Sequence, residues 1–177
     1  MKNCSRAAIL HPVLFSLALL VAVEALAAPP PPGVPRRNQC NNNLTAVMVQ
    51  DLSFGDYEGL NAGSITVTTS GTRTSTGPLL AGGIVTAAAF DVANTLAGCD
   101  YYPVRIRLPN NTTVSGPATM TVNNFTNSPP SLFTLSPTPG VPTRVYVGAD
   151  LLSTTNQAGG AYTTPTPFQV RFTHRRP

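Results

Sequence analysis

The segments Val104-Arg105-Ile106-Arg107-Leu108 and Phe168-Gln169-Val170-Arg171-Phe172 alternate apolar and polar side chains without interruption. Strict alternation is typical of a half-buried β-strand, because successive side chains point to opposite faces of a sheet. The same period of two recurs along the chain, and no window sustains the 3.6-residue periodicity of an amphipathic helix. The sequence therefore predicts an all-β fold in which Arg105 and Arg107 face solvent.

The alternation predicts about eight strands. Segment 44–52 carries apolar residues on both faces, which indicates an interior strand. In 64–69, Ile65 and Val67 point to one face and threonines to the other, as in a half-buried antiparallel strand. Gly, Pro and Asn turns separate the segments, so we expect a single Ig-like β-sandwich of mostly antiparallel strands, with a closed barrel as the alternative. The other predicted strands are 84–92, 104–108, 119–124, 132–135, 143–149 and 168–173.

Residues 1–27 are predicted to be a secretory signal peptide. Lys2 and Arg6 precede an apolar stretch over 13–23, and Ala25-Leu26-Ala27 matches a cleavage site. A membrane anchor is the alternative, but the apolar run is shorter than the roughly 20 residues that span a bilayer, and Glu24 ends it. We expect an exported protein of the periplasm, cell surface or extracellular space, with no membrane span after cleavage.

The rest of the chain divides into three predicted parts. Residues 28–39 include Pro29 to Pro32 and indicate a stiff spacer, 40–174 form the sandwich domain, and 175–177 form a basic tail. Cys40 and Cys99 are the two cysteines left after cleavage. In an exported chain they favour a disulfide, with free thiols or an intermolecular bridge as the alternatives.

The composition argues against several classes of function. Of 177 residues, 42% are hydrophobic and 10% charged, and after cleavage nine arginines and six acidic residues leave a net charge of +3. Four of the arginines form two terminal pairs, which is typical of solvated ends, so no nucleic-acid partner is expected. His174, the one remaining histidine, lies beside a basic end and offers no nucleophile–base pair, so we expect no enzyme. Asp51, Asp56 and Glu58 do not match a calcium loop, so neither a metal nor another cofactor is expected.

Two groups of residues are candidates for contacts with other molecules. Tyr101, Tyr102, Arg105 and Arg107 combine aromatic faces with cations that suit a glycan or protein ligand. The alternative is that one tyrosine covers the disulfide and the other lies on the surface.

Phe168, Val170 and Phe172 are candidates for strand exchange, because a donated strand needs apolar residues at alternate positions. The alternative is that they form the last strand of their own sandwich. An N-terminal donor is poorly supported, since residues 28–43 offer only Val34 as a sizeable aliphatic side chain.

Short motifs spread along the chain resemble, in their order and spacing, a family of exported bacterial domains known as domain of unknown function 4402. That family is similar to spore-coat-U-like and pilin-like sandwiches. The resemblance covers about residues 44–173 and implies a sandwich of the kind used in pilus or surface-fibre subunits, with no enzyme activity. The motifs are Leu52-Ser53-Phe54-Gly55, Gly63-Ser64-Ile65-Thr66-Val67, Phe90-Asp91-Val92, Ile106-Arg107-Leu108-Pro109, Val147-Gly148-Ala149-Asp150-Leu151 and Gly159-Gly160-Ala161-Tyr162 leading to Phe168-Gln169-Val170.

The resulting expectation is an exported structural or adhesive surface protein, a subunit of a pilus-like fibre assembled by β-strand donation. Its partners would be further copies of itself or a periplasmic chaperone. The alternative is a monomeric secreted module that binds a glycan or a protein through its loops.

Overall fold

The computed structural model describes residues 29–59, 61–115, 118–158 and 168–177. The predicted signal peptide and the Gly159–Tyr162 motif lie outside these residues. Within the described ranges, no helix is long and apolar enough to cross a membrane. The predicted all-β fold is confirmed. Its elements are α1 (Arg37–Asn42), β1 (Leu44–Gln50), β2 (Ser53–Phe54), β3 (Tyr57–Glu58), β4 (Gly63–Val67), β5 (Arg73–Thr76), β6 (Leu79–Leu80), β7 (Val85–Thr86), β8 (Ala88–Asn94), the 3-10 turn η1 (Cys99–Tyr101), β9 (Val104–Arg107), β10 (Asn111–Val114), β11 (Met120–Ser128), β12 (Leu132–Phe133), β13 (Thr143–Ser153) and β14 (Arg171–His174).

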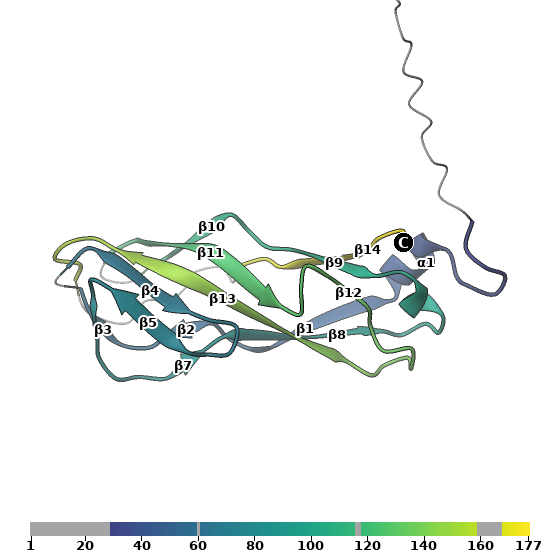
Figure 1. The fold of residues 1–177 in the computed structure, drawn as a ribbon, viewed down its shortest axis with the longest axis horizontal. Coiled ribbons are helices and arrows are strands. Elements are labelled where there is room, and N and C mark those ends of the chain that lie inside the picture. Colours follow the sequence, from purple (N-terminus) through teal and green to yellow (C-terminus); the bar gives the residue numbers. More distant parts are fainter. Residues whose placement is uncertain (1–28, 60, 116–117, 159–167) are drawn as a thin grey trace, which may run out of the picture.

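Two antiparallel layers form an elongated sandwich (Figure 1). The larger sheet has the order β1-β8-β13-β11-β10, and the smaller has the order β12-β9-β14. Between them lies a core to which both layers contribute alternate residues, as the period of two predicts. Its buried members include Phe90 and Val92 of β8, Val104 and Ile106 of β9, and Val145 of β13.

The long strand β13 joins this core to a second one. Its first half pairs with β8 and its second half, from Ala149 to Ser153, pairs with β4. Gly148 lies at the change of partner, where an added Cβ would come within 2.3 Å of the Val67 carbonyl oxygen. Glycine is therefore required for β4 to approach so closely. Beyond it, Ile65, Met120 and Leu151 form the second core at the end of the molecule away from α1 (Figure 1).

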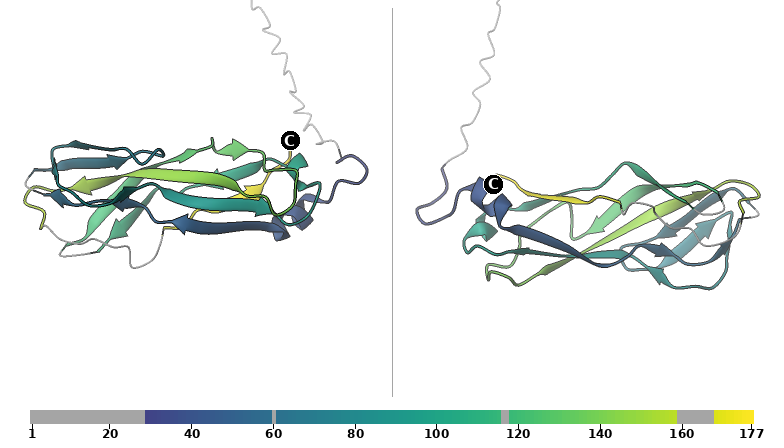
Figure 2. Two further views of the ribbon diagram at one scale, coloured as in Figure 1. Left: turned by 90° about the horizontal axis from the view of Figure 1, so that it is seen from below. Right: turned by 180° about the vertical axis from the view of Figure 1, so that it is seen from behind.

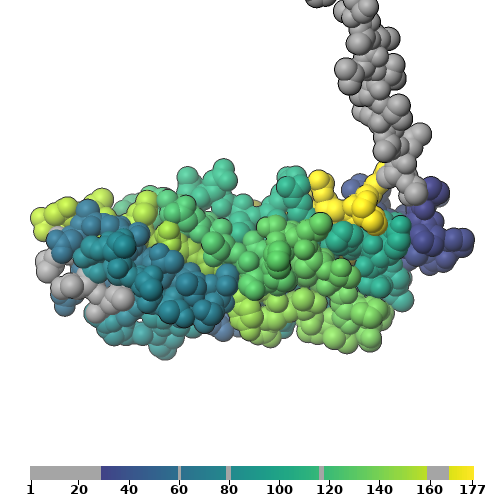
Figure 3. All heavy atoms as spheres, viewed as in Figure 1, coloured from purple at the N-terminus to yellow at the C-terminus, as the bar shows by residue number. Residues whose placement is uncertain are grey.

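A disulfide between Cys40 and Cys99 closes the opposite end, with a Cα–Cα distance of 5.4 Å. Both cysteines are buried. Cys40 lies in α1, which begins inside the segment predicted as spacer, and α1 contacts β14. The described N-terminal segment and the C-terminus therefore lie at the same end of the body (Figures 2 and 3).

One predicted placement is wrong. Segment 44–52 was expected inside a sheet, but β1 is an edge strand that pairs with β8 alone among the described residues. Every side chain from Thr45 to Gln50 is exposed. The pattern indicated an interior strand because apolar residues occupy both faces, and the structure leaves both faces uncovered. The alternation also missed the short or polar strands β2, β3, β5, β6 and β10.

Candidate functional site

One strand position of an immunoglobulin-type sandwich has no occupant among the described residues. In that architecture strands A, B, E and D form one sheet, and C, F and G form the other. Here β1, β8, β13 and β11 take the places of A, B, E and D, while β9 and β14 take those of C and F. No described strand takes the place of G, so none of the described strands pairs with the edge of β14 that points away from β9.

The backbone of Phe172 faces this edge. The N–H of Arg175 points towards β9 and donates to the Pro103 carbonyl at 2.8 Å. The N–H of His174 points the other way and donates to the Asn41 side-chain oxygen at 2.7 Å. Because backbone groups alternate along a strand, those of Phe172 lie on the same edge as those of His174. The α1 helix thus satisfies the His174 end of the edge, and Phe172 remains beside the empty place.

In the larger sheet, the edge strand β1 has exposed side chains on the face that points into the sandwich. Residues directly opposite in an antiparallel pair point to the same face. Met48 is opposite Phe90 and Ala46 is opposite Val92. Phe90 is 7% exposed and Val92 is fully buried, yet Met48 is 39% exposed and Ala46 is also exposed. The second layer therefore covers β8 but leaves Ala46 and Met48 of β1 uncovered.

We call the gap between β1 and β14 the open edge. It is bounded by Ala46 and Met48 of β1, by Phe172 of β14, and by Val170 just before β14. The aromatic core lies directly beneath it. Phe90 is 5.8 Å from Phe172 and 6.3 Å from Phe168, measured between ring centroids. One extended strand laid beside Phe172 would complete the smaller sheet and cover Met48.

The strand-exchange candidates line this site from within. Phe168, Val170 and Phe172 are partly buried and pack against the first core of their own chain. Phe172 pairs with Ile106 across β9. Phe172 therefore lies in the place of strand F, next to the empty place, and Phe168 and Val170 lie in the residues just before β14.

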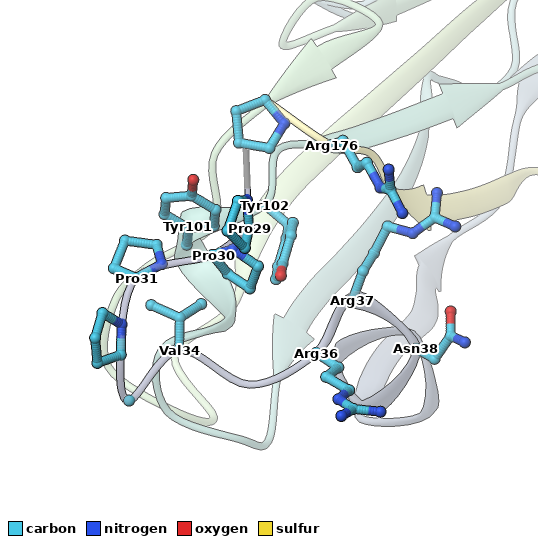
Figure 4. A pocket seen from close by; sticks show the side chains of 13 residues that line it. Pro29, Pro30, Pro31, Val34, Arg36, Arg37, Asn38, Tyr101, Tyr102 and Arg176 are labelled. Carbon is cyan, nitrogen blue, oxygen red and sulfur yellow. The ribbon is translucent and has the colours of Figure 1, made fainter. Parts of the chain in front are cut away.

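The two tyrosines lie at the closed end of the sandwich. Tyr102 is buried against the disulfide, whereas Tyr101 is partly exposed, with 5.1 Å between the ring centroids. Pro29, Pro30 and Pro31 lie beside them (Figure 4). The hollow between this proline segment and the domain measures about 800 Å³, and its lining includes neither Arg105 nor Arg107. The tyrosine pair and the arginine pair, which the sequence placed in one candidate surface, therefore do not line the same hollow.

His174 is not at a solvated end, as its basic neighbours suggested, but is buried. Its Nδ1 lies 2.8 Å from the Tyr102 carbonyl oxygen, which can only accept, so Nδ1 carries a proton. Burial lowers the pKa of the imidazole below 6.5, against the opposing effect of this hydrogen bond. The neutral ring can then only accept a hydrogen bond at Nε2, which lies 2.9 Å from Oδ1 of Asn94. Exchanging the oxygen and nitrogen of this amide places its N–H, which otherwise has no partner, as the donor to Nε2. His174 therefore ties β14 to β8 and η1.

At the far end, Arg73 holds loops together, which the sequence did not indicate. Its guanidinium donates to the backbone carbonyls of Phe54 and Asp56, both at 2.9 Å, and to those of Ala81 and Gly82. Asp51, Asp56 and Glu58 are exposed. Within the parts of the chain that the structure describes, no three His, Cys, Asp or Glu side chains gather closely enough to hold a metal ion.

Comparison with known proteins gives one match. Residues 44–172 match the family described as Domain of unknown function (DUF4402). No curated protein and no solved structure matches the chain. The matched range begins with β1 and ends within β14, so it includes both strands of the open edge.

Proposed function

The chain belongs to the DUF4402 family, whose description assigns no function, and from the open edge we propose that it is an exported structural or adhesive surface protein, a pilus-like fibre subunit that accepts a β-strand from a neighbouring subunit. The observation that carries the proposal is the exposure of Met48 on the interior face of β1, opposite a buried Phe90. An unpaired sheet edge over uncovered apolar side chains is the arrangement that β-augmentation completes.

The chemistry of the open edge defines the donated strand. Its backbone must pair with the N–H and C=O of Phe172, and its apolar side chains must occupy alternate positions to reach Met48 and the aromatic core. Residues 29–36 do not meet these requirements, because Pro29 to Pro32 and Pro35 lack the N–H that a ladder needs. The segment that fits this place is extended, apolar and free of proline, and the proposal assigns it to a neighbouring subunit.

Direct pairing between the β1 strands of two copies is a weaker explanation. The register between β1 and β8 shifts between Met48 and Gln50, which leaves Val49 without a partner in β8. Such a bulge twists an edge strand and hinders the addition of another strand to it. The edge of β14 carries no such irregularity over the register from Arg171 to His174.

Export is supported by the cross-link and by the predicted signal peptide. Disulfides persist in oxidising compartments and are rare where thiols are kept reduced. The Cys40–Cys99 bond joins the residues that precede β1 to those that precede β9. It thus holds the two layers together at the end where β14 finishes.

A monomeric secreted binding module is the second candidate function. It is favoured by the outer face of the smaller sheet, where Arg107 of β9 lies directly opposite Arg171 of β14. The two functions use different surfaces, so they can be tested separately.

The proposal is tested with the oxidised, signal-free chain and a synthetic peptide as the donor. The probe has the sequence of residues 168–174, which already packs its alternate apolar side chains against this core. Full burial of a Met side chain contributes about 1.5–3 kcal/mol, so covering the exposed 39% of Met48 contributes roughly 1 kcal/mol. Met48→Ser should therefore weaken peptide binding about fivefold, and a peptide with proline in place of its valine should not bind.

Val47→Ser is the matched control. Val47 is exposed on the opposite face of the same strand, so this substitution should leave the affinity unchanged. Equal effects of the two substitutions, or binding of the proline peptide, would show that the peptide does not enter the open edge. Both replaced side chains are exposed, so neither variant should lose much folding stability.

A further inference from the structure

The outer face of the smaller sheet carries three arginines on adjacent strands. Arg107 of β9 is directly opposite Arg171 of β14, and Arg105 is directly opposite Thr173. The intervening pairs, which include Ile106 with Phe172, point into the core. Arg105, Arg107, Arg171 and Thr173 therefore share the outward face, which we call the cationic face.

The strands of this smaller sheet contain no acidic residue that could offset the charge of the arginines. Directly opposite side chains have Cβ atoms about 4.5–5.5 Å apart, and like charges at that distance destabilise the pair. Within the described residues the one ion pair joins Arg144 to Asp91, and no hydrogen bond of the Arg107 or Arg171 guanidinium occurs there. From Tyr101 to Pro177 the sequence holds a single carboxylate, Asp150, which accepts a hydrogen bond from Asn124 at 2.9 Å.

We propose that the cationic face binds an anionic polysaccharide through its carboxylate or sulfate groups. A guanidinium matches such groups with two parallel hydrogen bonds, and an anion between Arg107 and Arg171 would remove their mutual repulsion. A polymer that repeats its charge along the chain can engage several arginines of one flat strand face at once. The Thr173 hydroxyl, beside Arg105, adds a donor and an acceptor for sugar hydroxyls.

This site is independent of strand acceptance. The cationic face uses side chains that point out of the sheet, whereas the open edge uses the backbone of Phe172 and side chains that point inward. A strand added beside β14 would leave the outward side chains of Arg107 and Arg171 free. The inference therefore goes beyond strand acceptance and does not require it.

An acidic segment of a second copy is the competing occupant. Asp56 and Glu58 are exposed around β3, at the opposite end of the molecule from α1 (Figure 1). They could meet the cationic face of a neighbour. A polysaccharide is favoured because Arg73 places a positive charge in the same group of loops, where its guanidinium donates to the backbone carbonyls of Phe54 and Asp56.

The test measures binding of the oxidised chain to a sulfated heparin fragment, with uncharged dextran as the blank and poly-glutamate as the acidic-peptide probe. Arg107→Gln with Arg171→Gln removes two charges from the cationic face. The matched control, Arg36→Gln with Arg176→Gln, removes two charges from exposed residues outside the cationic face. We expect the first pair to weaken heparin binding about tenfold and to reduce the salt dependence, and the control to change the affinity less than about twofold.

Equal losses in the two variants, tighter binding of poly-glutamate than of heparin, or no binding of heparin would overturn the proposal. A urea melt separates binding from folding. Removal of the Arg107–Arg171 repulsion should leave the melting midpoint equal to or above that of the unsubstituted chain. A lower midpoint would indicate that these arginines stabilise the fold. Met48→Ser should not affect heparin binding, which keeps this test apart from that of strand acceptance.

Discussion

Removal of the Cys40–Cys99 bond should lower the free energy of unfolding by about 4 kcal/mol. The two cysteines are 59 residues apart. In the chain-entropy model, opening a loop of that length returns about 14 cal/mol/K to the unfolded chain, which corresponds to about 4 kcal/mol at 25 °C. For a domain of this size that loss lowers the melting temperature by roughly 12 to 16 °C.

Urea melts of the oxidised chain, of the same chain after reduction, and of Cys40→Ala with Cys99→Ala measure this change. Reduction alters no side-chain volume, so it isolates the cross-link, while the double variant adds the cost of two small cavities. The unfolded chain without the bond is more expanded, so the dependence of the free energy on urea should become steeper. A loss below about 1 kcal/mol on reduction would refute the reasoning, because the bond would then restrain the unfolded chain very little.

Two further predictions concern groups at opposite ends of the sandwich. Burial lowers the pKa of His174 in the folded chain below 6.5, so the unfolded chain binds a proton more readily as the pH falls below about 6.5. The free energy of unfolding should therefore decrease from that pH down to the folded-state pKa. In urea melts between pH 7 and 5, His174→Gln should flatten this decline, and an unchanged slope would contradict the assignment. Arg73→Lys should cost about 2 kcal/mol, because a lysine cannot reach all four carbonyls, and amide exchange at Asp56 and Ala81 should accelerate. No effect beyond that of Arg107→Lys would contradict the role of Arg73.

The alternation of apolar and polar residues predicted those features of the fold that depend on one strand at a time, namely which residues form strands and which side chains are buried. Ile65 and Val67 are buried, Arg107 is exposed, and the positions of the longer strands along the chain follow from their period of two. The disulfide was also predicted, because only two cysteines remain in the chain after the signal peptide.

Features that depend on which strands pair, and in which register, could not be predicted from this alternation. Segment 44–50 carries the pattern of an interior strand, and only the topology shows that no layer covers Met48. Alternation places Arg107 and Arg171 on outward faces, but the register between β9 and β14 is what sets them opposite each other. His174 and Arg73 were missed because their partners are backbone carbonyls and an amide far away in the sequence.

Hydrogen exchange at the Phe172 amide, with and without the strand-168–174 peptide, tests strand acceptance most directly. In the chain alone this amide should exchange quickly, while those of Arg171 and Thr173, which point towards β9, should be protected. Saturation with the peptide should protect Phe172 as well. A Phe172 amide that is already protected in the isolated chain, or that stays fast when the peptide is bound, would contradict an open edge built to receive a strand.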